Sequence, residues 1–376
     1  MESELTLVTG FWPQKQQPIR TSAVYVRLFA ELLAHIDGAI PIVCCADPSL
    51  ESVIEKAIAP FPNVRLSSVP TEDLRYVRQR ERFVNFVPAS NSNPLRDTID
   101  YAAIVWSKPD VVNRVAQDIH TSHVGWIDFG LPHVVELMDV DWQEVVEESV
   151  RTERIRVCER YATAPSEVAD PWYFYSNNSA RIAGGLMTGP RDVWSDFTAH
   201  FDAEIERMIP TGTYALEEQV LAALTVQKPD MFERWFADYF GMLKNVRHIR
   251  RDIDTILTNL HHCRADGIPS TGASIVRVLL DSGASHLRLE PEQCFHVIDD
   301  GLACAVHADS DLADILAKTA LSLFHYSRLG RGMMKGIWRR SLLESLKVRG
   351  LEFADKPWTW EELTARPEFP IWMSCF

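Results

Sequence analysis

The first sixty residues alternate short apolar runs with helical patterns. A strand is predicted at residues 5–9, and the residues that follow carry apolar side chains at helical spacing up to Gly38. A second buried strand is predicted at residues 40–45, and Asp47-Pro48 then provides an N-cap and a first-turn proline for a helix. A third strand is predicted near residues 64–66. Strands that alternate with helices at this spacing predict parallel βαβ units and therefore an α/β fold.

In the next part of the chain, an acidic residue directly follows a predicted buried strand. Residues 98–118 have a helical pattern that is interrupted at Lys108-Pro109, because the residue before a proline is disfavoured in the α region. The apolar run that begins at His123 then stops at Asp128, and Gly130 follows. Ligands of open α/β sheets bind beyond the carboxyl ends of the strands, so Asp128 is a candidate site residue. The alternative is an Asx turn that closes the strand.

Two further motifs follow an acidic, mostly helical stretch and a polar loop predicted at residues 171–179. Gly184 and Gly185 lie in a predicted strand, after which Pro190 is expected to open a helix. Paired glycines in a strand indicate either close approach to the backbone or a β-bulge. Glu217 and Glu218 begin a predicted helix. A Glu beside a cleft can act as a general base or hold substrate hydroxyls, whereas an exposed first turn also favours acids because of the helix dipole.

Charge restricts the class of partner. The 376 residues include 38 basic and 52 acidic ones, which gives a formal net charge of −14. This balance disfavours binding to nucleic acids or anionic membranes, so no nucleic-acid partner is expected. Two local basic clusters indicate either a phosphorylated small molecule or solvated helix faces. They consist of Arg75, Arg78, Arg80 and Arg82, and of Arg328, Arg331, Lys335, Arg339 and Arg340.

The compartment is predicted from two absences in the sequence. The N-terminus lacks a basic signal-peptide region, and no uncharged apolar run reaches the ~18 residues that would span a bilayer, so we expect a cytoplasmic protein without an integral membrane segment. Seven cysteines without CxxC spacing predict reduced core thiols. Cys44 and Cys45 are adjacent in a strand and should point to opposite faces. His261 and His262 have no further zinc ligands at a usual spacing.

The pattern changes beyond Gly241. Long helical patterns follow, with weak strand signals at residues 294–298 and 302–306. We therefore predict a catalytic domain over residues 1–245 and a mainly helical C-terminal extension over residues 246–376, packed on the catalytic domain. The aromatic tail is expected to pack against the body of the protein, since it carries Trp358, Trp360, Trp372 and Phe376.

Five segments, in order, resemble the HtrL/YibB and WlaTC-like family of bacterial glycosyltransferases with the GT-A fold. They are LVTGFW, WSKP around Lys108, GWIDFG around Asp128, IAGGLMTG, and LEEQVLAAL followed by ADYFGMLKN. Together they cover roughly residues 5–245. The resemblance implies a GT-A-like, Rossmann-type mixed sheet flanked by helices. One half would hold a nucleoside-diphosphate sugar such as a UDP-sugar, and the other would complete the acceptor cleft.

The resemblance also implies roles for single residues. Asp128 would occupy the place of the DxD motif, and Glu217 or Glu218 would be the catalytic or sugar-positioning carboxylate. Lys108 would reach the phosphates or ribose of the donor. The remaining donor contacts would come from Thr9 and Phe11 beside the nucleotide and from Gly184 and Gly185 at the sugar.

Metal dependence is an open question at this point. A DxD motif normally offers two carboxylates to Mn²⁺ or Mg²⁺, but Phe129 and Gly130 follow Asp128 here. By the same resemblance, His325 would add a C-terminal metal ligand, and Arg328 and Arg331 would neutralise the leaving diphosphate. The alternative for His325 is packing within a helix. Two other acid pairs have DxD spacing without a preceding buried strand and are interpreted as surface acids: Asp139 with Asp141, and Asp252 with Asp254.

These patterns predict a glycosyltransferase that moves a sugar from a nucleoside-diphosphate sugar to a hydroxyl of a glycan, glycolipid or metabolite. One alternative is a GT-A-like module that binds a partner without catalysis. Another is a nucleotide-dependent hydrolase or nucleotidyltransferase on a similar sheet. The GxSxG, Walker, HExxH and strand-borne GxGxxG signatures are absent from the sequence.

Overall fold

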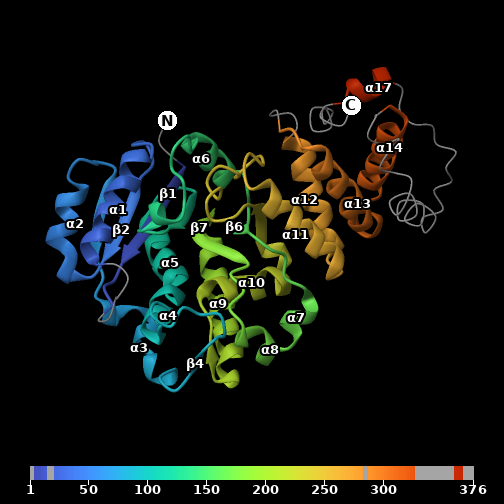
Figure 1. The fold of residues 1–376 in the computed structure, drawn as a ribbon. Coiled ribbons are helices and arrows are strands. Elements are labelled where there is room, and N and C mark those ends of the chain that lie inside the picture. Colours follow the sequence, from blue (N-terminus) through green and yellow to red (C-terminus); the bar gives the residue numbers. More distant parts are fainter. Residues whose placement is uncertain (1–3, 15–20, 283–286, 327–359, 367–376) are drawn as a thin grey trace. The chain divides into compact units, whose positions relative to one another are not determined.

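The computed structural model describes residues 4–14, 21–282, 287–326 and 360–366. The chain divides into two compact units, Met1–Val246 and Arg247–Phe376. The first unit is built around a seven-stranded sheet flanked by helices, and the described part of the second is helical (Figure 1). The predicted α/β class with a mixed sheet is therefore confirmed.

The sheet has the strand order β3-β2-β1-β5-β7-β6-β9. Neighbouring strands pair in parallel except at β7, which is antiparallel to both β5 and β6. All strands other than β7 therefore run in one direction. Their bounds are Leu5–Phe11 for β1, Ile42–Ala46 for β2, Val64–Ser68 for β3, His123–Ile127 for β5, Ile155–Glu159 for β6, Ile182–Pro190 for β7 and Phe232–Phe236 for β9.

The N-terminal units form as the sequence predicts. Helix α1 (Ser22–His35) connects β1 to β2, and α2 (Glu51–Ile58) connects β2 to β3. Asp47 caps the turn before α2, because its Oδ1 accepts a hydrogen bond from the backbone N–H of Ser49 at 3.0 Å. The same carboxylate accepts the N–H of Thr71 at 2.9 Å, so it also fixes the segment that leaves β3.

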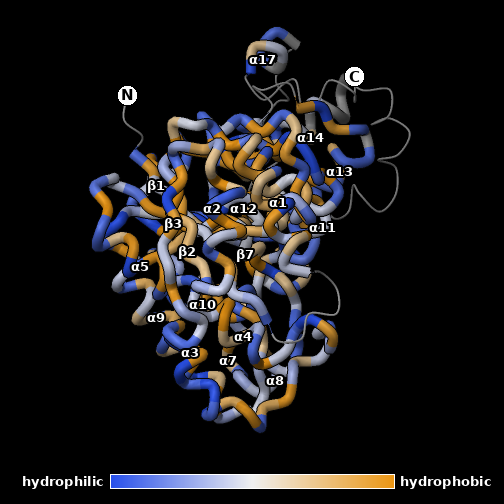
Figure 2. The backbone as a smooth tube through the Cα atoms, turned by 90° about the vertical axis from the view of Figure 1, so that its left-hand side faces the viewer, coloured by the Kyte–Doolittle hydropathy of each residue, from blue (hydrophilic) through white to orange (hydrophobic). Residues whose placement is uncertain are grey.

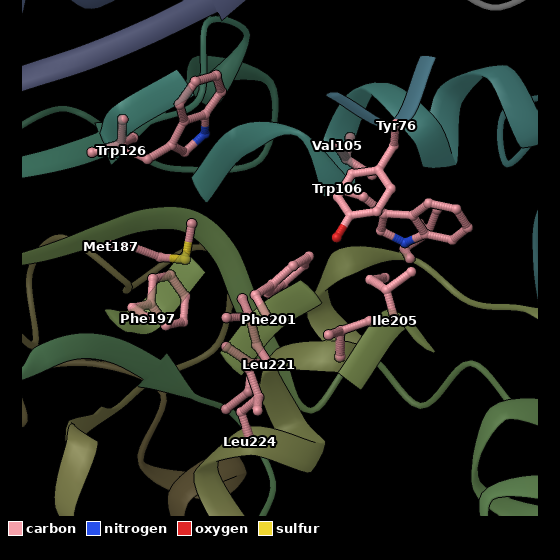
Figure 3. Close-up of a cluster of buried hydrophobic side chains, with 14 of the residues drawn as sticks. Tyr76, Val105, Trp106, Trp126, Met187, Phe197, Phe201, Ile205, Leu221 and Leu224 are labelled. Carbon is pink, nitrogen blue, oxygen red and sulfur yellow. The ribbon is translucent and has the colours of Figure 1, made fainter. Parts of the chain in front are cut away.

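Two hydrophobic clusters cover the two faces of the sheet. Helices α1, α2 and α6 (Trp142–Val150) contribute to one cluster, which contains Cys44. Four helices contribute to the other cluster, which contains Cys45: α4 (Ile99–Trp106), α5 (Lys108–Asp118), α9 (Val193–Met208) and α10 (Glu217–Gln227). Figure 3 shows Trp106, Phe197 and Phe201 of the second cluster, and Figure 2 shows the hydrophobic stretches along the chain. The opposite orientation of the two cysteines is confirmed.

The predicted interruption near Lys108 separates two helices. Helix α4 spans Ile99–Trp106 and α5 spans Lys108–Asp118. Ser107 stands between them, and its hydroxyl donates a hydrogen bond to the carbonyl of Ala103 at 2.8 Å. Lys108 therefore begins a helix, which fixes the direction in which its long side chain leaves the backbone.

Two local predictions in this unit are wrong. The predicted polar loop at residues 171–179 contains α8 (Pro171–Ser176), because Asp170 accepts the N–H groups of Trp172 and Tyr173 and Pro171 suits the first helical position. Pro190 ends β7 and does not open the next helix, which starts at Val193. The remaining short elements are α3 (Arg75–Arg78), α7 (Pro165–Ala169), and the parallel pair β4 (Val87–Pro88) and β8 (Thr213–Tyr214).

The second unit contains α11 (Ile253–Ala265), α12 (Pro269–Ser282), α13 (Pro291–Ala308), α14 (Ser310–Tyr326) and α17 (Trp360–Thr364). The strands predicted at residues 294–298 and 302–306 are wrong, since both segments lie in α13. Buried Cys294, Val297 and Ile298 follow helical spacing there. None of the helices in the described ranges is both long and apolar enough to span a membrane. Trp358, Trp372, Phe376 and the side chain of Trp360 lie outside the described residues.

Candidate functional site

The strand directions bring several polar side chains to one edge of the sheet. Asp128 follows β5, Arg160 follows β6, and Tyr239 lies three residues beyond β9. Because β7 runs the opposite way, the start of this strand, which includes Gly184, lies at the same edge. This is the edge at which α/β sheets bind ligands.

A pocket opens beside the ends of β1 and β5. Its polar lining includes Lys108, Asp128 and His133. Phe11 and Phe129 stack with their ring centroids 5.0 Å apart. Flat aromatic walls with a charged group at one side suit a ligand that has a planar ring and a polar extension. The aromatic lining comprises Phe11, Trp12, Tyr25, Tyr101, Trp126 and Phe129.

Lys108 lines the pocket and contacts two carboxylates. Its Nζ lies 2.8 Å from Oδ1 of Asp128 and 2.5 Å from Oε1 of Glu217, and only 6% of its side chain is exposed. Burial lowers the pKa of Lys108, but the two carboxylates outweigh burial and raise the pKa well above its ordinary value. Lys108 therefore stays charged at neutral pH.

Asp128 is the accessible carboxylate of this cluster. Its side chain is 37% exposed, while that of Glu217 is 6% exposed. Oδ1 accepts a hydrogen bond from Nε1 of Trp126 at 2.6 Å in addition to the contact with Lys108. Within the described residues, the carboxylate is thus held by side chains and not by the backbone N–H of an Asx turn.

Glu218 also contacts Gly184, and it forms a second, partly buried carboxylate site with Tyr239. The backbone N–H of Gly184 donates to Oε1 of Glu218 at 3.1 Å, and the hydroxyl of Tyr239 donates to both carboxylate oxygens at 2.7 and 2.8 Å. Burial, and then the negative charge of Glu217, raise the pKa of Glu218 to about 7. Glu217 is buried and Glu218 partly so, which means that the alternative of an exposed first helical turn is wrong.

Gly184 leaves room for the side chains of Glu217 and Glu218, and Gly185 leaves room for that of Leu131. A Cβ on Gly184 would lie 3.0 Å from Oε1 of Glu217 and 3.3 Å from Cγ of Glu218. One on Gly185 would lie 2.8 Å from Cδ1 of Leu131. The pairing of β6 with β7 also jumps here, from Val157 opposite Met187 to Cys158 opposite Ala183. Close approach and an irregular ladder therefore occur together at this point.

The other predicted site residues lie elsewhere. Thr9 is fully buried on β1 and does not line the pocket, although Phe11 does. His325 lies in α14 of the second unit, and its side chain is outside the described residues, as are Arg328 and Arg331 entirely. The roles assigned to these residues remain predictions.

The first basic cluster is electrically balanced. Each of its arginines forms an ion pair: Arg75 with Asp110 and Asp202, Arg78 with Asp73, Arg80 with Asp100, and Arg82 with Glu206. This arrangement matches the solvated-face interpretation better than a phosphate site.

A divalent metal finds few ligands in the described structure. No group of three or more His, Cys, Asp or Glu side chains within the described ranges could hold an ion. Asp128 Oδ1 already contacts Lys108 and Trp126. The described residues therefore do not form a metal site by themselves, and Mn²⁺ or Mg²⁺ binding remains a prediction.

Tyr239 and Arg160 were missed by the sequence reasoning. Both follow strands, β6 and β9, that the sequence did not predict, so neither residue could be placed at the sheet edge. The available signal was ADYFGMLKN, which contains Tyr239 directly after the residues of β9.

Comparison with known proteins gives a family match for the segment that carries most of these residues. Residues 75–248 match a family model described as "Bacterial protein of unknown function (HtrL_YibB)". This part of the chain is therefore similar to the HtrL_YibB family. The predicted family resemblance is therefore confirmed, and the HtrL_YibB segment contains Lys108, Asp128, Gly184, Glu217 and Glu218.

Searches beyond the HtrL_YibB family give distant likenesses. No curated protein matches the chain. Mouse xyloside xylosyltransferase 1 in its apo form has a TM-score of 0.39 and 9% identity, with 61% of this chain and 84% of that chain covered. The 4-diphosphocytidyl-2C-methyl-D-erythritol synthase of Anaerococcus prevotii DSM 20548 has a TM-score of 0.35 and 8% identity, over 69% of this chain and 96% of that chain. Likenesses with such low TM-scores and identities do not indicate the function of this chain.

Proposed function

We propose that this protein is a glycosyltransferase that moves a sugar from a nucleoside-diphosphate sugar to an acceptor hydroxyl. The observation that carries the proposal is the cluster of Lys108, Asp128, Glu217 and Glu218 around Gly184, at the ligand-binding edge of the sheet and beside an aromatic pocket. The family resemblance in the sequence supports the same reaction class.

The aromatic pocket is the proposed donor site. Its aromatic lining suits a nucleobase, and Lys108 and Asp128 lie where the pocket meets the carboxylate cluster. The exposed part of Asp128 would bind the sugar or its diphosphate. Glu217, which is buried against Lys108, would hold the ammonium in place instead of contacting the substrate.

Glu218 is the proposed base. With a pKa of about 7, a sizeable fraction of Glu218 is ionised at neutral pH, while it still binds a proton readily. As the bond from the sugar carbon to the diphosphate oxygen breaks, the acceptor oxygen forms the new bond to that carbon and gives its proton to Glu218. Tyr239 and the N–H of Gly184 hold the carboxylate in position.

None of these steps uses a metal ion. If a divalent ion enters with the diphosphate, the phosphates and water would supply most of its oxygen ligands. Among the described residues of this cluster, Asp128 would add a carboxylate ligand. The cytoplasmic location and the lack of a nucleic-acid partner likewise stay predictions from the sequence.

Thermal shift measurements test the donor site directly. The protein is heated with UDP, GDP and their sugars, each with and without Mn²⁺, because a ligand that binds only the folded state raises the melting temperature. We expect a shift with one base, followed by release of the diphosphate when an acceptor mixture is added. Binding without turnover would favour a binding module. Release of a monophosphate would favour a hydrolase or nucleotidyltransferase, and no binding at all would contradict the proposal.

A further inference from the structure

Arg160 is held close to the proposed base. It is the first residue after β6, and its Nη1 donates a hydrogen bond to the carbonyl of Ala180 at 2.8 Å. The guanidinium carbon lies 4.3 Å from the ring centroid of Tyr239. Tyr239 in turn donates its hydroxyl to Glu218. One tyrosine therefore separates the charge of Arg160 from the carboxylate of Glu218.

Within the part of the chain that the structure describes, no carboxylate pairs with Arg160. Arg160 is one of the lysines and arginines of the first unit that are described and not exposed. Each of the others has a carboxylate oxygen within 4.0 Å, whereas Arg160 takes part in none of the described ion pairs. Its Nε is also buried without a hydrogen-bond partner in the described structure. The paired residues are Arg75, Lys108, Arg156, Arg181, Arg207, Arg234 and Lys244.

The backbone that positions Arg160 is strained. Ala180, whose carbonyl accepts the Arg160 hydrogen bond, has a φ of 44°. A residue with a Cβ in the left-handed region costs on the order of 1–3 kcal/mol and occurs preferentially at functional sites. The backbone N–H of Arg160 also donates to the carbonyl of Arg181 at 2.7 Å. Both ends of Arg160 are thus anchored to the segment that leads into β7.

We infer that Arg160 binds an anionic group, a carboxylate or a phosphate, on the acceptor substrate. The inference rests on the proposed function, which makes Glu218 the base for the acceptor hydroxyl. The donor pocket lies at the ends of β1 and β5, while Arg160 follows β6, on the far side of β7 from that pocket. Two strand spacings separate β5 from β6, or about 10 Å. Arg160 therefore lies on the acceptor side of Glu218.

The chemistry of arginine selects the ligand class. A guanidinium offers paired N–H groups in a plane, which match the two oxygens of a carboxylate or phosphate. Nη1 of Arg160 is already occupied by Ala180 and Nε is buried, so the N–H groups of Nη2 would meet the anion. Acidic sugars and sugar phosphates are acceptors that combine such a group with hydroxyls.

Ligand-observed NMR with three small probes tests the inference. Glucuronic acid, glucose 6-phosphate and glucose are titrated into the full-length protein in the presence of the nucleoside diphosphate that gives the largest thermal shift, or without nucleotide if none does. We expect the two anionic probes to bind at least tenfold more tightly than glucose. Arg160→Gln should remove that preference, and Arg160→Lys, which keeps the charge without the paired N–H groups, should retain part of it.

Arg154→Gln is the matched control, because Arg154 precedes the same strand at its opposite end and is exposed. It should keep the full preference for the anionic probes. If all three probes bind equally to the unchanged protein, the inference is overturned, whether or not nucleotides bind. If Arg160→Gln abolishes the nucleotide shift, Arg160 serves the donor and the acceptor assignment is wrong. Anion preference without any nucleotide binding would support the role of Arg160 and contradict the proposed function.

Discussion

The ammonium of Lys108 lies 2.5 Å from Oε1 of Glu217, a residue 109 positions further along the chain, and both side chains are 6% exposed. This buried pair ties the start of α5 to the start of α10. Since a buried charge that loses its partner is strongly unfavourable, Lys108→Met should lower the free energy of unfolding by about 3–5 kcal/mol. Urea denaturation measures this loss.

The double variant Lys108→Met with Glu217→Leu provides the control for that experiment. Replacing both members by apolar residues leaves no unpaired charge between them, so most of the lost stability should return. If the losses of the two single variants simply add, the pair is not coupled as the geometry indicates.

Glu218 should make the protein less stable as the pH rises from about 4.5 to about 7. Its pKa is raised from 4.5 to about 7 by burial and by Glu217, so the folded state binds more protons than the unfolded state in this window. The free energy of unfolding then falls with pH, by at most about 1.4 kcal/mol per pH unit from this group. Denaturation curves of the wild type and of Glu218→Gln across this range isolate the effect.

Glu218→Gln should flatten the pH dependence, because it removes the titrating group. Turnover of the wild type should rise with pH through an apparent pKa near 7, since the ionised form is the base. Identical pH profiles of stability for the two proteins would show that Glu218 has an ordinary pKa.

The strand-end residues of this site were predictable from the sequence because local patterns fix them. The apolar run up to Ile127 forms β5, and its abrupt end at Asp128 places a carboxylate at the sheet edge. The break predicted at Lys108-Pro109 lies one residue earlier, at Ser107, because Pro109 is tolerated in the first turn of α5, where its missing N–H removes no helical hydrogen bond. These features depend on neighbours in sequence, which a single chain displays.

The contacts between distant segments were not predictable in the same way. The Lys108–Glu217 pair, and the bonds from Tyr239 to Glu218, depend on strand order and on the reversed direction of β7. Neither property has a local signal. The wrong strands in α13 arise because a helix buried on several sides shows short apolar runs, as strands also do.

An added methyl group at Gly184 should disturb both glutamates. In Gly184→Ala the new Cβ would lie 3.0 Å from Oε1 of Glu217, which Lys108 holds in place, and 3.3 Å from Cγ of Glu218. Small displacements of catalytic groups reduce rates strongly, so we expect a loss of roughly a hundredfold in turnover. Steady-state kinetics with the identified donor measures it.

Gly38→Ala is the matched control, since a Cβ on Gly38 meets nothing within 4 Å. This variant should keep both turnover and melting temperature. If Gly184→Ala also retains full turnover, the glutamates tolerate displacement and Gly184 does not position them for the reaction.

Asp128→Asn should reduce turnover far more than stability. The amide keeps the size of the carboxylate, and Oδ1 can still accept the Trp126 hydrogen bond, but the charge that faces the pocket is lost. Since the side chain is 37% exposed, solvent compensates part of the lost ion pair with Lys108, and the melting temperature should change little. We expect turnover to fall at least a hundredfold, as is usual when a group that stabilises transition-state charge is removed.

Asp139→Asn makes the same chemical change at an exposed position, where the backbone φ of 62° is one that asparagine tolerates well. Its turnover and melting temperature should equal those of the wild type. Equal and small losses in turnover and stability for Asp128→Asn would make Asp128 a structural residue at the end of β5, and the donor would then have to be bound by the aromatic walls and Lys108 alone.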